Sequence, residues 1–312
     1  YLSQSERMQE AGEERNVTYR HLLELMDKTF ELVDPATRRM EVPSPDGDIP
    51  CYFTDAGPGS PCLIMVNGLD STKEHIYTAE LPRVLAERGI SCLSVDQPGA
   101  GEALRLRGMK ARKDTEVWVG ACIDHLLTNT DVDPKRIGLA GWSLGGYYAP
   151  RAAAFEKRLA LVVAWGANHN WGAVQRRRLE REGENPVPHY WKHVLWVWGH
   201  DDLDEFITFA DDIHLDGIVE RITCPFLITH GENDRQIPLE YAHRSHEQAV
   251  NSPKCELRIF TREEGGAEHI GLDNFPYVVE FTADWVAETF AEVPGGEYVV
   301  PRPGGAAARG RA

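Results

Sequence analysis

Short apolar runs alternate along this chain with longer segments of helical periodicity. Nearly continuous apolar runs occupy residues 61–66, 90–95, 137–140, 159–165 and 225–229. Such runs are typical of strands that are buried on both faces of a parallel sheet. Between them, apolar residues recur at intervals of three and four, which predicts helices. The pattern therefore indicates an α/β fold with a mostly parallel central sheet and helices on both faces.

The two ends of the chain depart from this pattern. Residues 1–38 place apolar side chains at helical spacing before any strand signal, which predicts part of an N-terminal helical module, truncated at its start. Residues 40–42 and 49–53 flank the turn at 45–47 and are predicted to pair as a hairpin. Residues 293–312 are rich in Pro, Gly, Ala and Arg, so we expect a disordered tail.

The alternation of strands and helices is interrupted at residues 168–218. This segment holds four of the eight tryptophans of the chain, and a helix is predicted at 171–182. Because it is inserted between two strands, at the level where strand ends open, we expect a lid that borders an apolar pocket. The alternative is that the aromatic side chains form only the small core of the insertion. The main α/β domain would then comprise residues 39–167 and 219–292.

Composition narrows the classes of function. The formal charge of -16 and the lack of a broad cluster of Lys and Arg argue against a nucleic-acid partner. No apolar run reaches the length of a membrane span, and no signal peptide is visible. The six cysteines are scattered, which favours a reducing, cytoplasmic location. The oligomeric state stays open, with a homodimer as one alternative.

A candidate nucleophile lies where one apolar run ends, in the segment Gly141-Trp-Ser143-Leu-Gly145. Residues compatible with a helix follow it. A Gly-x-Ser-x-Gly segment between a strand and a helix raises the serine hydroxyl above the sheet, since the glycines let the backbone crowd together at the bend. We therefore predict that Ser143 is a nucleophile. The alternative is a turn that merely ends a strand.

Two further residues follow in the order that a catalytic triad on such a scaffold requires. Asp234 lies just after the apolar run 225–229, and His269 lies beyond the next predicted strand at 256–260. The order Ser, Asp, His is that of the α/β-hydrolases. Competing interpretations are a turn or helix-capping role for Asp234 and an ordinary loop histidine at position 269.

Hydrolysis through a serine also needs backbone donors for the developing oxyanion. The N–H of Leu144, directly after the nucleophile, is one predicted donor. The other is predicted in the loop after the first central strand, at Leu69, where Gly68 allows a close approach. In both cases the side chain contributes nothing to this role.

Neither a metal nor a cofactor is predicted. His189 and His193 are four residues apart, with His200 and Asp201 nearby, a spacing compatible with a zinc site on one helical face. Their aromatic neighbours favour packing or exposure to solvent instead. Residues 96–101 contain two glycines but lack the Lys and Ser/Thr of a phosphate-binding P-loop. A tight turn beside the active site is sufficient to explain this segment.

Four motifs together resemble a known group of hydrolases. They are Gly68-Leu-Asp-Ser-Thr-Lys-Glu74, Asp96-Gln-Pro-Gly-x-Gly-Glu102, Gly141-Trp-Ser-Leu-Gly-Gly146 and Trp165-Gly-Ala167. Over about residues 15–292 the chain resembles the dihydroxypseudooxynicotine hydrolase group of α/β-hydrolases, and even more the fungal pigment hydrolases that shorten aromatic polyketides. The resemblance implies an α/β-hydrolase fold with an inserted helical lid.

The resemblance also implies a reaction, namely hydrolysis of a carbon–carbon bond next to a ketone in an aromatic polyketide-like β-diketone, without metal or organic cofactor. Ser143 would attack the ketone, and His269 would protonate the carbanion that leaves. The group is thought to use a lid carboxylate to assist the leaving carbon, and Glu180 and Glu182 fall near that region.

Two other functions stay open at this point. The same triad serves a carboxylesterase, lactonase or thioesterase, which differs only in the leaving group. A catalytically silent binding protein with this fold is the other alternative, although the retained residues of the triad argue against it.

Overall fold

The computed structural model describes residues 12–181 and 189–293. Residues 1–11 of the predicted N-terminal module lie outside this range. So does the predicted tail beyond Val293.

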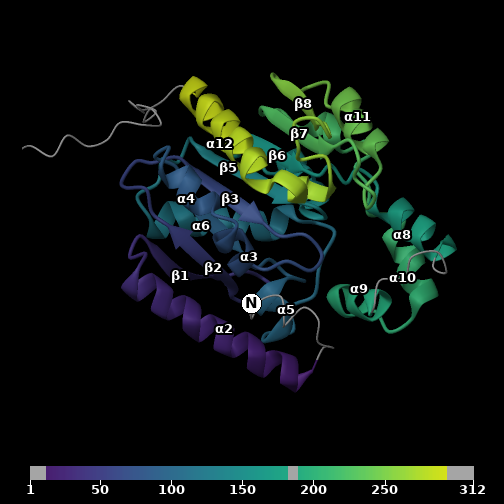
Figure 1. Ribbon diagram of the computed structural model, residues 1–312, viewed down its shortest axis with the longest axis horizontal. Helices are drawn as coiled ribbons and strands as arrows, with labels where there is room; N and C mark the ends of the chain where they lie inside the picture. Colours follow the sequence, from purple (N-terminus) through teal and green to yellow (C-terminus); the bar gives the residue numbers. More distant parts are fainter. Residues whose placement is uncertain (1–11, 182–188, 294–312) are drawn as a thin grey trace, which may run out of the picture.

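The described residues form an eight-stranded sheet at the centre of the molecule (Figure 1). In chain order its strands are β1 (Thr37–Val42), β2 (Ile49–Thr54), β3 (Cys62–Val66), β4 (Ser91–Val95), β5 (Ile137–Trp142), β6 (Leu161–Trp165), β7 (Phe226–Gly231) and β8 (Cys255–Phe260). Their spatial order is β1-β2-β4-β3-β5-β6-β7-β8, and the strands from β3 to β8 pair in parallel while β1–β2 and β2–β4 pair antiparallel. The predicted mostly parallel sheet is confirmed, and the predicted hairpin is β1–β2, with β1 beginning at Thr37 instead of residue 40.

Helices occupy most of the connections between the strands. They are α2 (Glu13–Leu32), α3 (Lys73–Thr78), α4 (Leu81–Ala86), α5 (Gly101–Arg105), α6 (Glu116–Asn129), α7 (Gly145–Phe155), α8 (Trp171–Glu180), α9 (Tyr190–Trp198), α10 (Leu203–Ala210), α11 (Leu239–Gln248) and α12 (Phe275–Glu292). Two short 3-10 helices, η1 (Val219–Arg221) and η2 (His269–Asn274), precede β7 and α12. The sequence pattern alone predicts neither α9 nor α10.

The apolar runs of the sequence supply two cores, one on each face of the sheet. In β3, Ile64 and Val66 pack with α6 and α7 on one face, while Leu63 and Met65 pack with α4 and α12 on the other. Successive side chains of a strand point to opposite faces, so a continuous apolar run serves both cores at once. This layering confirms the predicted α/β-hydrolase fold.

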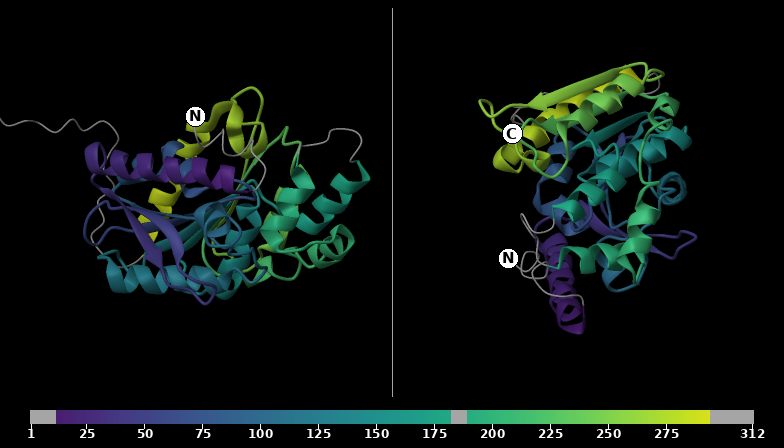
Figure 2. Two further views of the ribbon diagram at one scale, coloured as in Figure 1. Left: turned by 90° about the horizontal axis from the view of Figure 1, so that it is seen from below. Right: turned by 90° about the vertical axis from the view of Figure 1, so that its right-hand side faces the viewer.

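The N-terminal helix α2 lies along the edge of the sheet beside β1 and β2 (Figure 2). Its apolar side packs on Tyr52 of β2, and Phe30 meets the Tyr52 ring edge-on with centroids 4.8 Å apart. Tyr19 of the same helix is fully buried. The helix is therefore an integral layer of the described fold.

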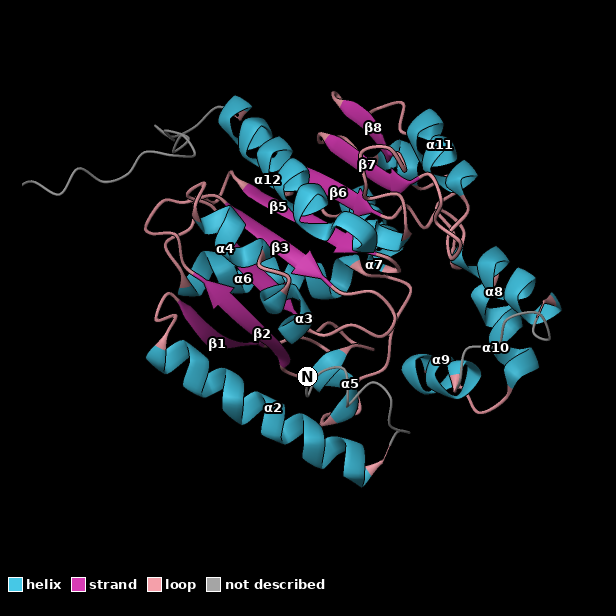
Figure 3. Ribbon diagram, viewed as in Figure 1, coloured by secondary structure: helices cyan, strands magenta, loops and turns pink. Residues whose placement is uncertain are grey.

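The segment between β6 and β7 carries α8, α9 and α10, which we call the insertion (residues 168–218). These helices lie on the side of the molecule to which the arrowheads of β3, β5 and β6 point (Figure 3). Trp171, Trp198 and Phe206 are buried and pack ring against ring, so these aromatic side chains form the core of the insertion itself. Its role as a lid, and its boundaries as a domain, stay predictions.

All six cysteines carry free thiols in the structure. Among the helices of residues 12–181 and 189–293, none is both long and apolar enough to cross a membrane.

Candidate active site

Ser143 lies on a sharp turn between β5 and α7, as the elbow motif predicts. Its backbone is left-handed, with φ of 58°, a conformation that is uncommon for residues other than glycine. Its N–H donates to the carbonyl of Trp165, 2.8 Å away, which anchors the turn to the adjacent strand. A Cβ atom on Gly141 would lie 2.4 Å from the carbonyl oxygen of Gly145, so only glycine fits at this position. Ser143 itself is partly exposed.

Asp234 lies in the loop after β7, and its side chain is completely buried. One carboxylate oxygen accepts the backbone N–H groups of Gln236 and Ile237, at 2.8 and 3.0 Å. Burial raises the pKa of Asp234, but the hydrogen bond and charge of His269 outweigh it and hold the pKa below its usual value. The carboxylate is therefore fixed in place and ionised.

His269 follows β8 and bridges the other two residues. Its Nδ1 lies 2.8 Å from Asp234 Oδ2, and its Nε2 lies 2.9 Å from Ser143 Oγ. A carboxylate can only accept, so Nδ1 carries the proton and Nε2 is left to accept the serine hydroxyl. The structure thus brings together three residues that are distant in sequence, in the hydrogen-bonded order that activates a serine.

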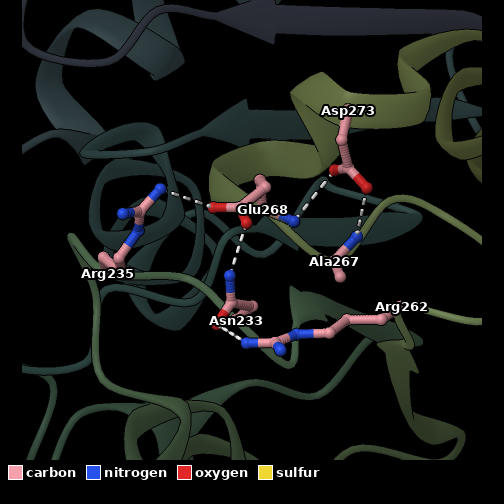
Figure 4. Close-up of a pocket in the computed structure, with 6 residues that line it drawn as sticks. All are labelled: Asn233, Arg235, Arg262, Ala267, Glu268 and Asp273. Carbon is pink, nitrogen blue, oxygen red and sulfur yellow. Dashed lines mark hydrogen bonds and ion pairs between the residues drawn. The ribbon is translucent and has the colours of Figure 1, made fainter.

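The loops that carry Asp234 and His269 are tied to each other through neighbouring residues, of which Figure 4 shows Asn233 and Glu268. Asn233 donates its backbone N–H to the carbonyl of Ala267 at 2.9 Å, and its side-chain amide donates to Glu268. Asp273 accepts three successive backbone N–H groups, of residues 266 to 268, at 2.9–3.1 Å. These contacts fix the distance between the two loops, and with it the bond between His269 and Asp234.

The two residues predicted as oxyanion donors belong to segments that adjoin the nucleophile. Leu144 directly precedes α7, where backbone N–H groups lack partners within the helix and the helix dipole favours negative charge. On the other side, a Cβ atom on Gly68 would lie 2.9 Å from Ser143 Cβ, so the backbone leading to Leu69 passes directly against the serine. This arrangement lets both N–H groups approach the oxygen of a carbonyl whose carbon has bonded to Ser143 Oγ.

The loop after β3, which carries Leu69, is held at both ends by Asp96. The same carboxylate oxygen accepts the Asn67 side-chain amide at 3.2 Å and the Lys73 backbone N–H at 2.7 Å. Within the loop, the Ser71 hydroxyl accepts the N–H of Gly68 at 3.1 Å and donates to Asn67 Oδ1 at 2.8 Å. The loop therefore has a defined shape even before any substrate binds.

Sequence reasoning missed a buried cluster of charges beneath this loop. The ammonium group of Lys73, which is inaccessible to solvent, lies 2.8 Å from Glu74, 3.0 Å from Asp96 and 2.9 Å from Glu102. Burial lowers the pKa of Lys73, but the charges of Asp96 and Glu74 outweigh it, so the pKa lies well above its usual value. The signal was present in the sequence, because these residues belong to two of the four motifs that carry the resemblance.

Tyrosines of α2 and β2 complete the cluster. The Tyr19 hydroxyl donates to Glu74 at 2.9 Å and lies 3.2 Å from Asp96, and the Tyr52 hydroxyl donates to Glu74 at 2.7 Å. The N-terminal helix thus contacts the same carboxylates that hold the loop carrying Leu69.

The other candidates of the sequence occupy different positions. His193 lies against Leu69, with Nε2 3.2 Å from the Leu69 carbonyl oxygen. No group of three or more His, Cys, Asp or Glu in the described part of the chain is placed to hold a metal ion. Glu180 is exposed at the end of α8, and Glu182 lies outside the described residues. Among the contacts of the described residues, none joins Glu180 to the triad.

Comparison with known proteins places this chain among hydrolases. Residues 78–292 match the model of the prolyl oligopeptidase family. The chain is 31% identical to 2,6-dihydropseudooxynicotine hydrolase of Paenarthrobacter nicotinovorans, in an alignment that covers 70% of this chain and 57% of that protein. It is 27% identical to 20-hydroxy-prefusarin hydrolase of Gibberella moniliformis, in an alignment that covers 85% of this chain and 72% of that protein.

Solved structures agree with the sequence comparison. The crystal structure of the 2,6-dihydroxy-pseudo-oxynicotine hydrolase superimposes with a TM-score of 0.74 at 26% identity, over 93% of this chain and 78% of that one. In the sequence alignments the chain spans about half the length of the first curated relatives it matches. It covers 57% of the hydrolase of Paenarthrobacter nicotinovorans and 46% of a hydrolase of Aspergillus aculeatus.

Proposed function

Since this chain belongs to the prolyl oligopeptidase family of α/β-hydrolases, we propose that it is a serine hydrolase with Ser143 as nucleophile, His269 as general base and Asp234 as the residue that orients the base. The observation that carries this proposal is the continuous hydrogen-bonded path through His269, 2.9 Å to Ser143 and 2.8 Å to Asp234. The partial exposure of Ser143 supports it, because a carbonyl carbon can reach the hydroxyl.

We further propose that the bond cleaved is a carbon–carbon bond next to a ketone, in an aromatic polyketide-like β-diketone. The resemblance of the four motifs supports this reaction. So do the relatives that are named as hydrolases of a pseudooxynicotine and of a prefusarin. A role in pigment biosynthesis is part of the same proposal. Several aromatic residues of the insertion are only partly buried and stay available for substrate, namely Tyr190, Trp191, Trp196 and Phe209.

In this mechanism the Ser143 hydroxyl attacks the ketone carbon and transfers its proton to His269 Nε2. The negative charge that forms on the ketone oxygen is stabilised by the N–H groups of Leu69 and Leu144, each worth about 3–4 kcal/mol in such sites. The adduct then breaks the carbon–carbon bond and expels an enolate or phenolate, which takes the proton from His269. Water, activated by the same imidazole, finally releases the carboxylic acid from Ser143.

The proposal is tested with an acylated naphthopyrone as substrate. The wild type is expected to release the carboxylic acid, and Ser143→Ala to slow this release by at least about 10⁴-fold, as in other serine hydrolases. Ser44→Ala is the control, because Ser44 lies in the turn between β1 and β2, where its hydroxyl donates to the carbonyl of Gly47. Acid release by Ser143→Ala at the wild-type rate would reject the role of Ser143.

A second measurement separates this reaction from its alternatives. Mass spectrometry of the wild type after exposure to the diketone is expected to find an acyl group on Ser143, together with the shortened aromatic product. Rapid turnover of simple aryl esters without cleavage of the diketone would instead indicate an esterase. Failure of a fluorophosphonate probe to label Ser143 would indicate a binding protein without catalytic activity.

A further inference from the structure

The loop that carries Leu69 receives its support from two different parts of the molecule. Its ends are held by the core, because Asp96 binds residues 67 and 73. Its tip, at Leu69, is contacted by the insertion. There the imidazole of His193, on α9, lies with Nε2 3.2 Å from the Leu69 carbonyl oxygen.

The direction of this hydrogen bond follows from the chemistry of the two groups. A carbonyl oxygen can only accept, so His193 must donate its Nε2 proton. Burial lowers the pKa of His193 to about 4. The charge of Asp70 and the bond to Leu69 oppose this shift, and the charges of Arg105 and Arg15 add to it. The imidazole is therefore neutral near pH 7 and keeps one tautomer, the one with the proton on Nε2.

Helix α9 is itself anchored, so His193 is presented from a fixed position. The carbonyl of Val197 accepts the backbone N–H of Ala111 at 2.8 Å, and the carbonyl of Trp196 accepts the Lys110 ammonium at 2.8 Å. One helical turn before His193, the hydroxyl of Tyr190 donates to Gln175 of α8 at 2.5 Å. The insertion thus connects the core at residues 110–111 with the tip of the loop.

From this geometry we propose that His193 is a positioning residue for the oxyanion hole. By holding the carbonyl of Leu69, it restricts rotation of that residue about its own backbone and so keeps the Leu69 N–H aimed at the oxygen above Ser143. Docking of the insertion would then complete the site, and not merely cover it. This inference rests on the proposed function of Ser143.

The proposal predicts a loss that is specific to the transition state. His193→Leu removes the donor while filling a similar volume, and kcat for p-nitrophenyl acetate is expected to fall about tenfold with little change in KM, less than the ~10² to 10³ lost when a donor itself is removed. His193→Gln keeps an N–H at a similar reach and is expected to recover most of this loss.

Two ligands of the same skeleton make the test sharper. An aryl trifluoromethyl ketone forms a tetrahedral adduct with an active serine and needs the oxyanion hole, whereas the matching methyl ketone binds without forming one. In His193→Leu the inhibition constant of the trifluoromethyl ketone is expected to rise about tenfold, in step with kcat, while that of the methyl ketone stays unchanged. His125→Leu makes the same substitution on α6, where the His125 imidazole lies against Asn129 and not against the loop, and is expected to behave as the wild type.

The other outcomes overturn the inference in distinguishable ways. Unchanged kcat in His193→Leu, or equal weakening of both ketones, would assign His193 no role or a role in substrate binding. If circular dichroism shows that His193→Leu does not fold, His193→Gln is compared with His193→Asn instead. The amide of Asn does not reach as far as that of Gln, so equal kinetics of these two variants would contradict the proposal. A wild type that neither hydrolyses the ester nor prefers the trifluoromethyl ketone would reject the proposed function itself.

Discussion

Within residues 12–181 and 189–293, two hydrogen-bonded groups of serine, histidine and aspartate occur, and only one of the two has the features of a catalytic site. The first is Ser143, His269 and Asp234. The second, which we call the buried triplet, consists of Ser245, His169 and Asp216. In the buried triplet His169 Nδ1 lies 2.8 Å from the Ser245 hydroxyl, and His169 Nε2 lies 3.0 Å from Asp216.

Both groups join a serine to an aspartate through an imidazole, although the two ring nitrogens exchange partners. They also differ in the surroundings of the serine. Ser143 is partly exposed on a left-handed turn directly before α7, whereas Ser245 lies inside α11 and exposes only 1% of its surface. The N-terminus of α7 offers N–H groups to an anion, but the N–H of a residue inside a helix is already bonded. A serine bound to an imidazole and a carboxylate therefore becomes a nucleophile only where substrate and oxyanion donors can reach it.

The buried triplet has a structural role. His169 follows β6 at the start of the insertion, and its carbonyl accepts the N–H of Leu215, 2.8 Å away, at the end of the insertion. Asp216 also binds Gln248 and Arg244, at 3.0 and 2.6 Å. The triplet thus joins both ends of the insertion to α11.

The largest expected difference between the two groups concerns catalysis. Asp234→Asn is expected to lower kcat by about 10⁴-fold, because the amide favours the wrong tautomer of His269 and cannot stabilise its charged form. Asp216→Asn, the matched change in the buried triplet, is expected to leave kcat unchanged. Steady-state kinetics on a substrate that the wild type cleaves provide the measurement. Equal losses in the two variants would contradict the distinction drawn here.

The second difference concerns stability. Ser245→Ala leaves the buried Nδ1 of His169 without a partner, so the free energy of unfolding is expected to fall by about 1–3 kcal/mol. Ser143→Ala is expected to change it far less, since Ser143 is partly exposed and water can replace the lost bond. Unfolding in guanidinium chloride measures both. A Ser245→Ala variant as stable as the wild type would show that the triplet does not hold the insertion.

The contrast explains how much of this site the sequence could reveal. The elbow around Ser143 and the order of Asp234 and His269 follow from local pattern, because strand ends of a parallel sheet meet at one edge. The buried triplet carries no local pattern, since its residues meet only after the chain has left and re-entered the sheet. The contact of His193 with Leu69 was missed for a related reason, because it depends on how α9 docks and not on the local sequence.

The smallest expected effect is the dependence of stability on pH. Burial lowers the pKa of His169 below 6.5, and the bond to Asp216 offsets this only in part. Between 6.5 and its folded pKa, the unfolded chain therefore binds more protons at this residue than the folded protein does. The contribution of His169 to the free energy of unfolding is therefore fully present above about pH 6.5. It decreases as the pH falls toward the lower pKa of the folded state.

His169→Gln keeps a polar side chain but cannot take up this proton. The difference in unfolding free energy between wild type and variant is therefore expected to shrink as the pH falls from about 8 to 5. Other buried histidines, such as His193 and His230, whose pKa values burial also lowers, are present in both proteins and cancel in the difference. Denaturant titrations at several pH values provide the measurement. If the unfolding free energies of wild type and variant change with pH in parallel, His169 has the same pKa in the folded and unfolded states. Burial would then not be what distinguishes the triplet from the site at Ser143.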